Sequence, residues 1–540
     1  MKKDSLFKGT FILSISLILT KIIGLVYIIP YYAIIGGKNN MILINYAYNY
    51  YVLLLEISSA GLPLALSKLI SKYNEEGNFE KSKKIYTIGT VFLLIMGLIG
   101  FMFFLFGSDF LARQTIASID QPLRYTVEEL SLVIKTLSLA VPFVILCAGL
   151  RGVFQAHDVM TPSAISQFLE QIVRISIMMV GSYIVLQITQ GNIVYANAIA
   201  TGAASVGAIL AFAILIYYYY KYRTSLEMNQ KNTSYFKVDS TLSILKELLL
   251  VAAPFVVVST FFSIITIIDQ NTIIPAMDKL GLATVAEEQF NIYNNYVNKL
   301  VMIAVALAPA FTGAFLPSIT RLYVRQDKIN LKLQINKLLL SLQMIVLPAL
   351  FAMYILVIPL YTVFYEYDLD GFYLMKVYLP LALGYATYGI TSIVMQAIDK
   401  QKFNILIVVF GIMFKYIFNE YFILAFESAG AIYCSTIAYA IMIFLNMYII
   451  NKNVDLNLKE LNYNLLKLIF ANFAMLIVVS AIVDSIFNNF NLSNKFDSVI
   501  LIAISGIIGA PLYFFVLNKI KFTKYLFGRE FSILSMIRRR

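Results

Sequence analysis

The sequence has few of the residues that enzymes most often use for chemistry. It contains one histidine, His157, and two cysteines, Cys147 and Cys434, which lie far apart in apolar segments. One histidine leaves little for a metal site or a nucleophilic triad, and two distant cysteines in apolar surroundings favour neither a disulfide framework nor a metal cluster. We therefore expect no metal, no catalytic residue and no enzymatic activity.

Charged residues are also scarce. They make up 13% of the 540 residues, whereas 60% of the residues are hydrophobic, and the mean hydropathy is +0.79. A soluble protein of this length does not have such a composition, which is typical of an all-α polytopic membrane protein. The first apolar run, residues 9–35, is too long for the core of a signal peptide and lacks a small-residue cleavage site, so we expect it to remain as a spanning helix.

Hydropathy along the chain predicts fourteen spanning helices. The predicted spans are residues 9–35, 41–67, 85–107, 129–151, 162–187, 192–220, 246–277, 289–317, 336–364, 372–397, 403–426, 428–450, 465–488 and 497–519.

The net charge of +12 raises the possibility of nucleic-acid binding, but the distribution of the charge argues against it. With the N-terminus inside the cell, 31 of the 42 Lys and Arg residues fall in cytoplasmic connections, tails or the cytoplasmic ends of spans, six fall in external connections or the outer ends of spans, and five fall deeper within spans. This asymmetry follows the positive-inside rule and predicts that both termini are cytoplasmic. The basic tail, residues 521–540, is expected to lie against anionic lipid.

A polar segment and three repeated motifs predict two lobes. Residues 221–245 form a cytoplasmic linker whose first part, 221–239, lacks apolar periodicity. Motifs at 28–30, 61–63 and 155–158 resemble others at 273–275, 315–317 and 396–399, which lie 245, 254 and 241 residues further on. We therefore predict six-helix lobes at 1–220 and 246–450, related by a pseudo-two-fold axis along the membrane normal. Spans 13 and 14 lie in 451–520.

The fifth predicted span, residues 162–187, carries a polar stripe along one side of its helix. The stripe consists of Ser163, Gln167, Glu170, Gln171 and Arg174. A charge at the centre of a lipid-exposed helix costs about 2.5 to 3.5 kcal/mol, so this side is expected to face the interior of the bundle or a solvated cavity. The alternative is that Glu170 and Arg174, four residues apart, form a neutral pair that only holds helices together.

Further polar residues lie within other spans. Nine charged residues fall inside the predicted membrane region, namely Lys21, Glu56, Lys135, Glu170, Arg174, Asp269, Lys299, Lys415 and Glu420. Facing lipid, they would together cost roughly 22 to 32 kcal/mol, so they must be sheltered and hydrated. Lys21 and Lys299 have no acidic residue within one turn of their own helices. They are therefore either free to meet an anionic headgroup or paired across helices with Glu56 and Asp269.

The N-terminal third resembles a known transporter family. The motifs are Gly9-Thr10, Lys21-Ile22-Ile23-Gly24, Ala60-Gly61-Leu62-Pro63-Leu64-Ala65, Arg151-Gly152 and Met160-Thr161-Pro162-Ser163, followed by Glu170-Gln171 and Arg174. They are similar to those of Gram-positive lipid II flippases of the MurJ type and of the related stage V sporulation and polysaccharide biosynthesis proteins. These proteins belong to the multidrug/oligosaccharidyl-lipid/polysaccharide (MOP) exporter superfamily.

This resemblance implies a V-shaped, two-lobe transporter that moves undecaprenyl-linked lipid II, the peptidoglycan precursor, from the inner to the outer leaflet by alternating access. In the family, basic residues of spans 1, 2 and 8 line a central cavity and meet the diphosphate. Lys21 stands where better-known members carry an arginine, and Lys299 is the counterpart in span 8. Tyr27 and Glu56 stand at positions that are basic in those members, so the chain departs from the family there.

These considerations select the candidate site residues. We expect the substrate to be bound by Lys21, Glu170, Arg174, Lys299, Asn49 and Asn295, and we assign coupling or gating to Glu56, Asp269, Arg151 and Lys415. No cofactor is expected, although Na⁺, H⁺ or the membrane potential could drive transport, and the chain is expected to act as a monomer in the cell membrane. The alternatives are an exporter of another lipid-linked polysaccharide unit, a multidrug efflux pump and, more remotely, a membrane-embedded glycosyltransferase.

Overall fold

The computed structural model describes residues 20, 23–24, 26–57, 61, 65–66, 69–70, 73–74, 78–116, 125–157, 159–227, 240–305, 319–320, 322–487 and 492–527. Every regular element within these ranges is a helix. Ten of the described helical segments are long and apolar enough to cross a membrane. The all-α membrane architecture is therefore confirmed, whereas most of the first predicted span, including Lys21, and the end of the eighth lie outside the described residues.

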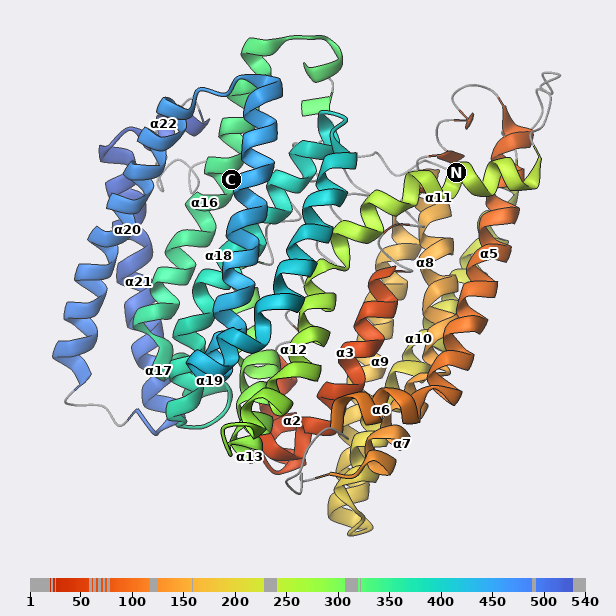
Figure 1. Ribbon diagram of the computed structural model, residues 1–540, viewed down its shortest axis with the longest axis horizontal. Coiled ribbons are helices and arrows are strands. Elements are labelled where there is room, and N and C mark those ends of the chain that lie inside the picture. The colour runs from red at the N-terminus through yellow and green to blue at the C-terminus, as the bar shows by residue number, and fades with distance from the viewer. Residues whose placement is uncertain are drawn as a thin grey trace. The chain divides into compact units, whose positions relative to one another are not determined.

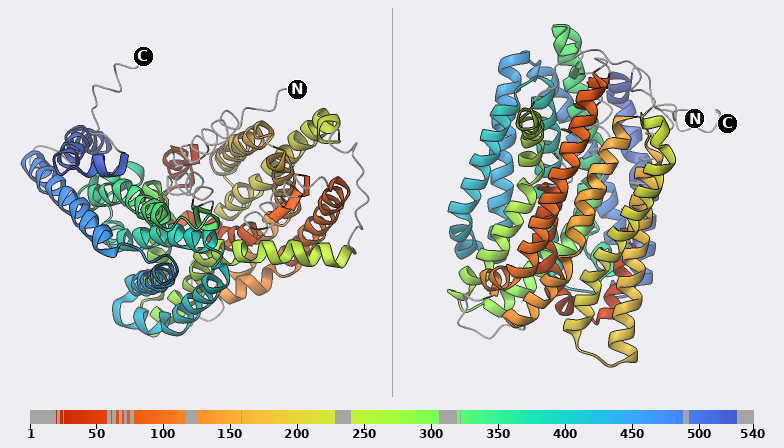
Figure 2. Two further views of the ribbon diagram at one scale, coloured as in Figure 1. Left: turned by 90° about the horizontal axis from the view of Figure 1, so that it is seen from above. Right: turned by 90° about the vertical axis from the view of Figure 1, so that its right-hand side faces the viewer.

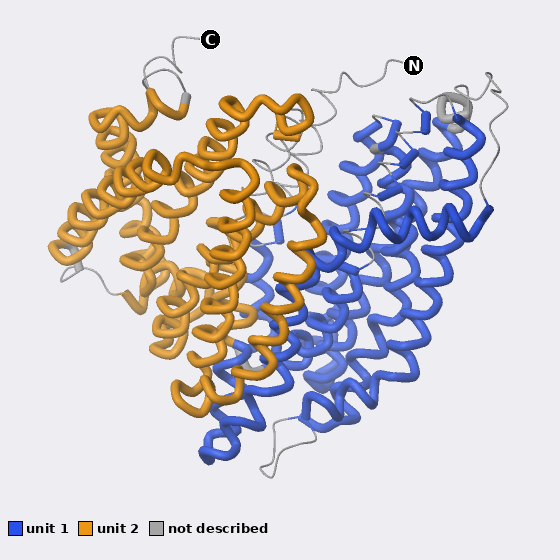
Figure 3. The backbone as a smooth tube through the Cα atoms, turned by 45° about the horizontal axis from the view of Figure 1, so that its top comes forward, with its two compact units in different colours: residues 1–291 blue, residues 292–540 orange. Residues whose placement is uncertain are grey.

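The chain forms two compact units, residues 1–291 and 292–540 (Figure 3). The first unit contains α2 (Ile28–Ile35), η1 (Lys38–Met41), α3 (Ile42–Glu56), α5 (Phe79–Phe106), α6 (Ser108–Ile116), α7 (Val127–Leu137), α8 (Ala140–Ala156), α9 (Thr161–Tyr183), η3 (Ile184–Ile188), α10 (Ile193–Glu227), α11 (Thr241–Ser259), α12 (Phe261–Asp278) and α13 (Ala283–Asn291). Helices α11 to α13 thus group with the N-terminal helices, although they follow the predicted linker. The predicted lobe boundaries and their symmetry stay predictions.

The second unit is also helical throughout its described residues. It contains η5 (Ile292–Val297), α14 (Asn298–Val305), α16 (Lys328–Ile355), α17 (Val357–Phe364), α18 (Leu369–Ala397), α19 (Gln401–Val454), α20 (Leu458–Phe487), α21 (Lys495–Lys519) and α22 (Phe522–Phe527). Within this unit α18 packs along α19, and α20 packs on both α16 and α21.

Local sequence signals account for several helix ends. The Thr126 hydroxyl accepts from the Glu129 backbone N–H while the Glu129 carboxylate accepts from the Thr126 N–H, which makes a complete capping box at the start of α7. Asn78 and Ser240 accept in the same way from Lys81 and Ser243 at the starts of α5 and α11. Each cap satisfies a backbone donor that the first turn leaves unpaired.

In the first unit, α5, α8 and α10 run side by side along their length (Figure 2). Helix α11 crosses the end of α5, and α12 then runs beside α3 (Figure 1). The expected single span 246–277 is therefore wrong, because it is two helices that meet at Thr260. The hydroxyls of Ser259 and Thr260 both donate to the Val256 carbonyl, a contact that competes with the backbone ladder and bends helices.

Helix α19 is a hairpin of two arms. Its 54 residues are interrupted at Phe426 and Glu427, where Glu427 has a φ of 53°. The Lys415 Nζ donates to the Ala431 carbonyl at 2.7 Å, although 16 residues of straight helix would span about 24 Å. The chain therefore reverses here, which confirms the predicted division between residues 403–426 and 428–450.

The reversal of α19 depends on a glycine. A Cβ on Gly430 would lie 2.0 Å from the Phe422 carbonyl oxygen and 2.8 Å from the Ile423 nitrogen. Because both are backbone atoms, they cannot move aside without opening the turn, and we expect Gly430→Ala to destabilise the protein by about 3 kcal/mol or more. The midpoint of thermal unfolding of the purified protein measures this loss.

Gly506 in α21 is the matched control for that experiment. A Cβ there meets nothing within 4 Å, so Gly506→Ala should stabilise the helix by roughly 0.5 to 1 kcal/mol through its better helix propensity. If the two substitutions shift the unfolding midpoint equally, the tight turn does not hold the arms of α19 together.

Candidate functional site

The polar stripe of α9 faces the neighbouring helices α8, α3 and α10. After α8 ends at Ala156 the chain reverses, and α9 begins at Thr161 with Pro162 in its first turn, where proline is favourable. Within the stripe Ser163 is buried, and Gln167, Glu170, Gln171 and Arg174 are half-buried. The prediction that this stripe points away from lipid is therefore consistent with its burial.

Glu170 forms its ion pair with Arg151 of α8. The two groups are 2.7 Å apart (Arg151 Nη2 to Glu170 Oε2), with side chains only 12% and 22% exposed. The Nε of Arg151 also donates to the Ser166 hydroxyl at 3.1 Å. The expected alternative, a pair between Glu170 and Arg174, is wrong because the carboxylate is oriented towards α8 instead.

Arg174 contacts α3 instead of an acidic residue. Its Nη1 donates to the Tyr48 hydroxyl at 2.9 Å, and its guanidinium carbon lies 5.6 Å from the centre of the Tyr48 ring. Within the described residues no carboxylate oxygen lies within 4.0 Å of the guanidinium nitrogens. The cluster of Arg151, Glu170 and Arg174 therefore carries a net charge of +1, and within the described residues Arg174 is the member that has no carboxylate at ion-pair distance.

Two glycines allow helices to approach this cluster closely. A Cβ on Gly207 of α10 would lie 2.9 Å from the Glu170 carbonyl oxygen and 3.4 Å from the Arg174 Cβ. A Cβ on Gly24 would lie 3.2 Å from the Nε2 of Gln171. Gly24 of the first predicted span therefore lies beside the polar stripe, whereas Lys21 lies outside the described residues.

A second polar network joins α3 to α12 and α6. Asn49 donates to Gln270 at 2.7 Å, and Gln270 donates to Thr115 at 3.2 Å. The Tyr50 hydroxyl lies 2.9 Å from the Thr115 hydroxyl and donates to Asn271 at 3.1 Å. These amides and hydroxyls are all neutral, so the network can hold helices together or bind sugar hydroxyls without changing the charge of the site.

The two acidic residues assigned to coupling also lie on α3 and α12. Asp269 is buried, with 4% of its surface exposed, next to Gln270. Glu56, at the end of α3, is half-buried, and its Oε2 is enclosed without a hydrogen-bond partner among the residues that the structure describes. Within the described residues no three His, Cys, Asp or Glu side chains are grouped so that they could hold a metal ion.

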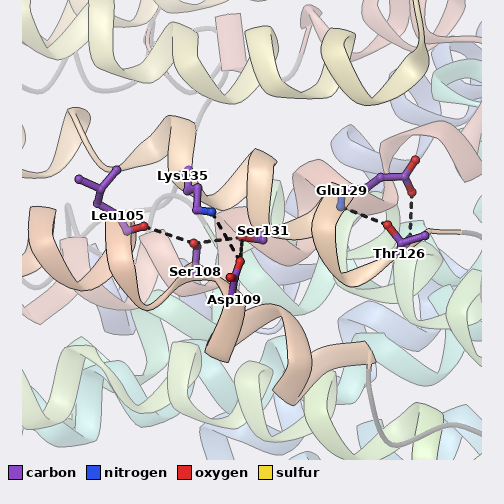
Figure 4. A network of polar contacts seen from close by, with 7 residues as sticks. All are labelled: Leu105, Ser108, Asp109, Thr126, Glu129, Ser131 and Lys135. Carbon is purple, nitrogen blue, oxygen red and sulfur yellow. Dashed lines mark hydrogen bonds and ion pairs between the residues drawn. The ribbon is translucent and has the colours of Figure 1, made fainter.

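Lys135 has a partner that the sequence did not predict. Its Nζ lies 3.6 Å from the carboxylate of Asp109 on α6, and the Ser131 hydroxyl donates to the same carboxylate (Figure 4). The hydrogen bond from Ser131 and then the positive charge of Lys135 hold the pKa of the Asp109 carboxyl below its ordinary value. At neutral pH this exposed carboxylate is ionised and links α6 to α7.

The remaining candidates lie in the second unit. Asn295 is buried in the π-helical segment η5, and Lys299 is half-buried on α14. Lys415 is fully buried, and its contact with the Ala431 carbonyl holds the arms of α19 together. Its assignment to gating, like those of the other candidates, stays a prediction.

Sequence reasoning missed Tyr48, which contacts Arg174, as well as Tyr50, Asn271 and Thr115 of the second network. Tyr48 lies on α3 between Asn45 and Asn49, so it belongs to a helix already recognised as polar. The Tyr48 hydroxyl could therefore have been included among the candidate site groups. Thr115 could not, because it lies outside every predicted span, between residues 85–107 and 129–151.

The chain is similar in sequence to known membrane-associated biosynthesis and transport proteins. Residues 6–323 match the family described as polysaccharide biosynthesis protein. The chain is 30% identical over 533 residues to the protein named Lipid II flippase MurJ of Bacillus subtilis (strain 168), covering 98% of this chain and 97% of the relative.

Two solved structures share the fold. One is described as lipid II flippase MurJ in an inward closed conformation; it is 17% identical, covers 95% of this chain and 99% of its own, and has a TM-score of 0.62. The other is an inward-facing multidrug resistance MATE family transporter of the MOP superfamily; it is 13% identical, covers 79% and 93%, and also has a TM-score of 0.62. At these identities the likeness concerns the fold alone.

Proposed function

Since this chain belongs to the polysaccharide biosynthesis protein family, we propose that it is a lipid II flippase, which moves the lipid-linked peptidoglycan precursor from the inner to the outer leaflet of the cell membrane. The full-length similarity to a lipid II flippase supports this proposal. The chain acts as a transporter and not as an enzyme, so the site binds and releases its substrate without covalent chemistry.

The observation that carries the proposal is the uncompensated charge of Arg174. A half-buried cation without a carboxylate partner is costly, unless an anion neutralises it during the working cycle. Arg151 pairs with Glu170, and among the described residues the Arg174 guanidinium donates to a neutral phenol, so most of its five donors are available to a ligand. A planar guanidinium is well suited to a diphosphate, which it can bind through two parallel hydrogen bonds.

We propose that Lys21, Arg174 and Lys299 attract the diphosphate as fixed charges. Asn49, Asn295 and the hydroxyls around them bind sugar and peptide, while the polyprenyl tail remains in lipid. A membrane potential that is negative inside favours export of an anion by about 2.3 kcal/mol per charge and 100 mV. If Na⁺ or H⁺ also moves, Glu56, Glu170 and Asp269 are the candidate ligands.

The proposed topology has fourteen spanning helices, two six-helix lobes related by a pseudo-two-fold axis, two additional C-terminal helices and both termini in the cytoplasm. The support for it is the asymmetric distribution of Lys and Arg along the sequence. We propose that the protein works as a monomer by alternating access to the two sides of the membrane.

The test is the leaflet distribution of lipid II in cells that are depleted of this protein and lack any other lipid II flippase. A membrane-impermeant probe reports the outer pool. We expect the outer pool to fall and the inner pool to rise on depletion, and the wild-type chain to restore both. An outer pool that does not change on depletion would show that lipid II is not the substrate, and export of other lipid-linked glycans or of drugs would then be tested.

A further inference from the structure

The end of α10 carries an unusual group of aromatic side chains. Residues 217–222 read Tyr-Tyr-Tyr-Tyr-Lys-Tyr. Tyr218 and Tyr222 stack with their ring centres 5.9 Å apart and their planes at 12°, and Tyr217 meets Tyr218 edge-on at 5.4 Å. Because each ring restricts its neighbour, the group presents an ordered aromatic surface instead of separate mobile side chains.

Lys221 lies on this surface. Its Nζ is 5.8 Å from the ring centres of both Tyr217 and Tyr218. Within the described residues no carboxylate oxygen lies within 4.0 Å of it, so the ring faces hold the ammonium without cancelling its charge. We call Tyr217, Tyr218, Tyr220 and Lys221 the Tyr–Lys platform.

The Tyr–Lys platform is accessible from outside the helix bundle. Tyr217 and Tyr220 are 61% and 66% exposed, and Lys221 is exposed as well. Beneath them, Tyr218 and Tyr222 pack against a buried cluster that includes Cys147, Phe154 and Leu215. The phenol hydroxyls and the ammonium are therefore available to a ligand while the rings behind them are held in place.

The Tyr–Lys platform also lies at the boundary of a membrane span. The apolar segment of α10 runs from Ile193 to Tyr222, so the platform is at its last turn. Tyr219 stacks on Tyr86 of α5 at 6.1 Å, which brings Lys83 and Lys84 of α5 to the same end of the bundle. Tyrosine and lysine together at the end of a span are typical of the level of lipid headgroups.

We propose that the Tyr–Lys platform binds the phosphate of an anionic phospholipid. Lys221 supplies the charge, and the hydroxyls of Tyr217 and Tyr220 donate to phosphate oxygens. An anionic lipid fits better than an acidic protein segment because the platform lies at the last turn of an apolar span and because the basic residues around it complement a negative headgroup. Under the topology of the proposed function, this lipid belongs to the cytoplasmic leaflet.

The absence of tryptophan from the sequence provides a direct test. Tyr220→Trp introduces the sole tryptophan of the full chain into the platform, and its indole N–H can replace the phenol as a donor. The variant is purified in detergent and titrated with brominated phosphatidylglycerol or brominated phosphatidylcholine while the tryptophan is excited selectively. We expect the anionic lipid to quench the fluorescence at a several-fold lower concentration than the zwitterionic lipid. Lys221→Gln should raise the midpoint for the anionic lipid about fivefold, which corresponds to about 1 kcal/mol for one lysine at a membrane surface.

Helix α20 offers a matched control. Lys467 lies 4.3 Å from the ring centre of Tyr463, which is 61% exposed, but among the described residues these two form a single pair without a stacked surface. With the reporter Tyr463→Trp, Lys467→Gln should change the midpoint less than twofold. The proposal is wrong if both lipids quench Tyr220→Trp equally, or if Lys221→Gln has no larger effect than Lys467→Gln.

This test is independent of the proposed function. Quenching reports binding at the end of α10 and does not require lipid II to be transported. A protein that binds the anionic lipid but does not restore the outer pool of lipid II would disprove the flippase proposal and leave the lipid site standing. The reverse result would disprove the lipid site alone.

Discussion

Arg174→Gln is expected to reduce lipid II transport by about 30-fold or more while leaving the protein folded. Loss of one partner from a buried, hydrogen-bonded charge pair costs at least about 2 kcal/mol, and here the lost partner would be the one that meets the diphosphate. The protein should remain folded because Arg174 donates to a neutral hydroxyl, so its removal leaves no carboxylate unpaired. The outer pool of lipid II in depleted cells expressing the variant measures the effect.

Two further variants separate charge from position in that experiment. Arg174→Lys keeps the charge but loses the planar fork, so transport should lie between those of wild type and Arg174→Gln. Tyr48→Phe removes the hydroxyl that holds the guanidinium and should have the smallest effect, since the charge remains. If Arg174→Gln is present in the membrane at the normal level and transports lipid II at the wild-type rate, Arg174 does not bind the substrate.

Glu170→Gln is expected to destabilise the protein by about 3 kcal/mol. Breaking a buried ion pair leaves the other charge uncompensated, and in soluble proteins this costs about 3 to 5 kcal/mol. The lower end applies here, because the side chains of Arg151 and Glu170 retain 12% and 22% exposure and because glutamine can still accept a hydrogen bond. The thermal unfolding midpoint of the purified chain, or its inactivation half-life at a fixed temperature, measures the loss.

The double variant Arg151→Met and Glu170→Gln tests whether the ion pair serves only the fold. It removes both charges, so it should be more stable than either single variant if the pair serves only the fold. The exposed pair of Lys332 and Asp455, 2.6 Å apart in the second unit, provides the control, and Lys332→Gln should shift the midpoint very little. A shift from Glu170→Gln as small as that of the control would show that the pair of α8 and α9 is not buried in the working protein.

The charged residues at the polar stripe of α9 are expected to have two different roles, transport and stability. Arg174 is expected to affect transport and spare stability, whereas Glu170 and Arg151 are expected to affect stability first. The sequence placed Glu170 and Arg174 on one polar face, because residues four apart share a side of a helix, and it gave Arg151 only as a separate candidate for coupling or gating. It could not decide which charges pair, because Glu170 has one basic residue on its own helix and another on α8, and only the packing of α8 against α9 selects between them.

For the backbone, too, the sequence predicts some features and only the packing decides others. Hydropathy located the division between residues 426 and 428, because Glu427 interrupts an apolar run. The close approach of Gly430 to Phe422, which makes that division a tight hairpin, involves backbone atoms and has no hydropathy signal. The break of span 246–277 at Thr260 was missed for a related reason, since hydroxyl groups that bond to their own helix leave the apolar pattern intact.

The sequence alone determined that this is an all-helical membrane protein of a recognisable transporter family, with charges that must be sheltered from lipid. Composition and period decide these properties, because lipid permits only backbones whose hydrogen bonds are satisfied within the segment. The tertiary structure decided the partners: Arg151 for Glu170, Tyr48 for Arg174 and Asp109 for Lys135. An ion pair or hydrogen bond depends on separations of a few ångströms between helices distant in sequence, and only their packing sets those separations.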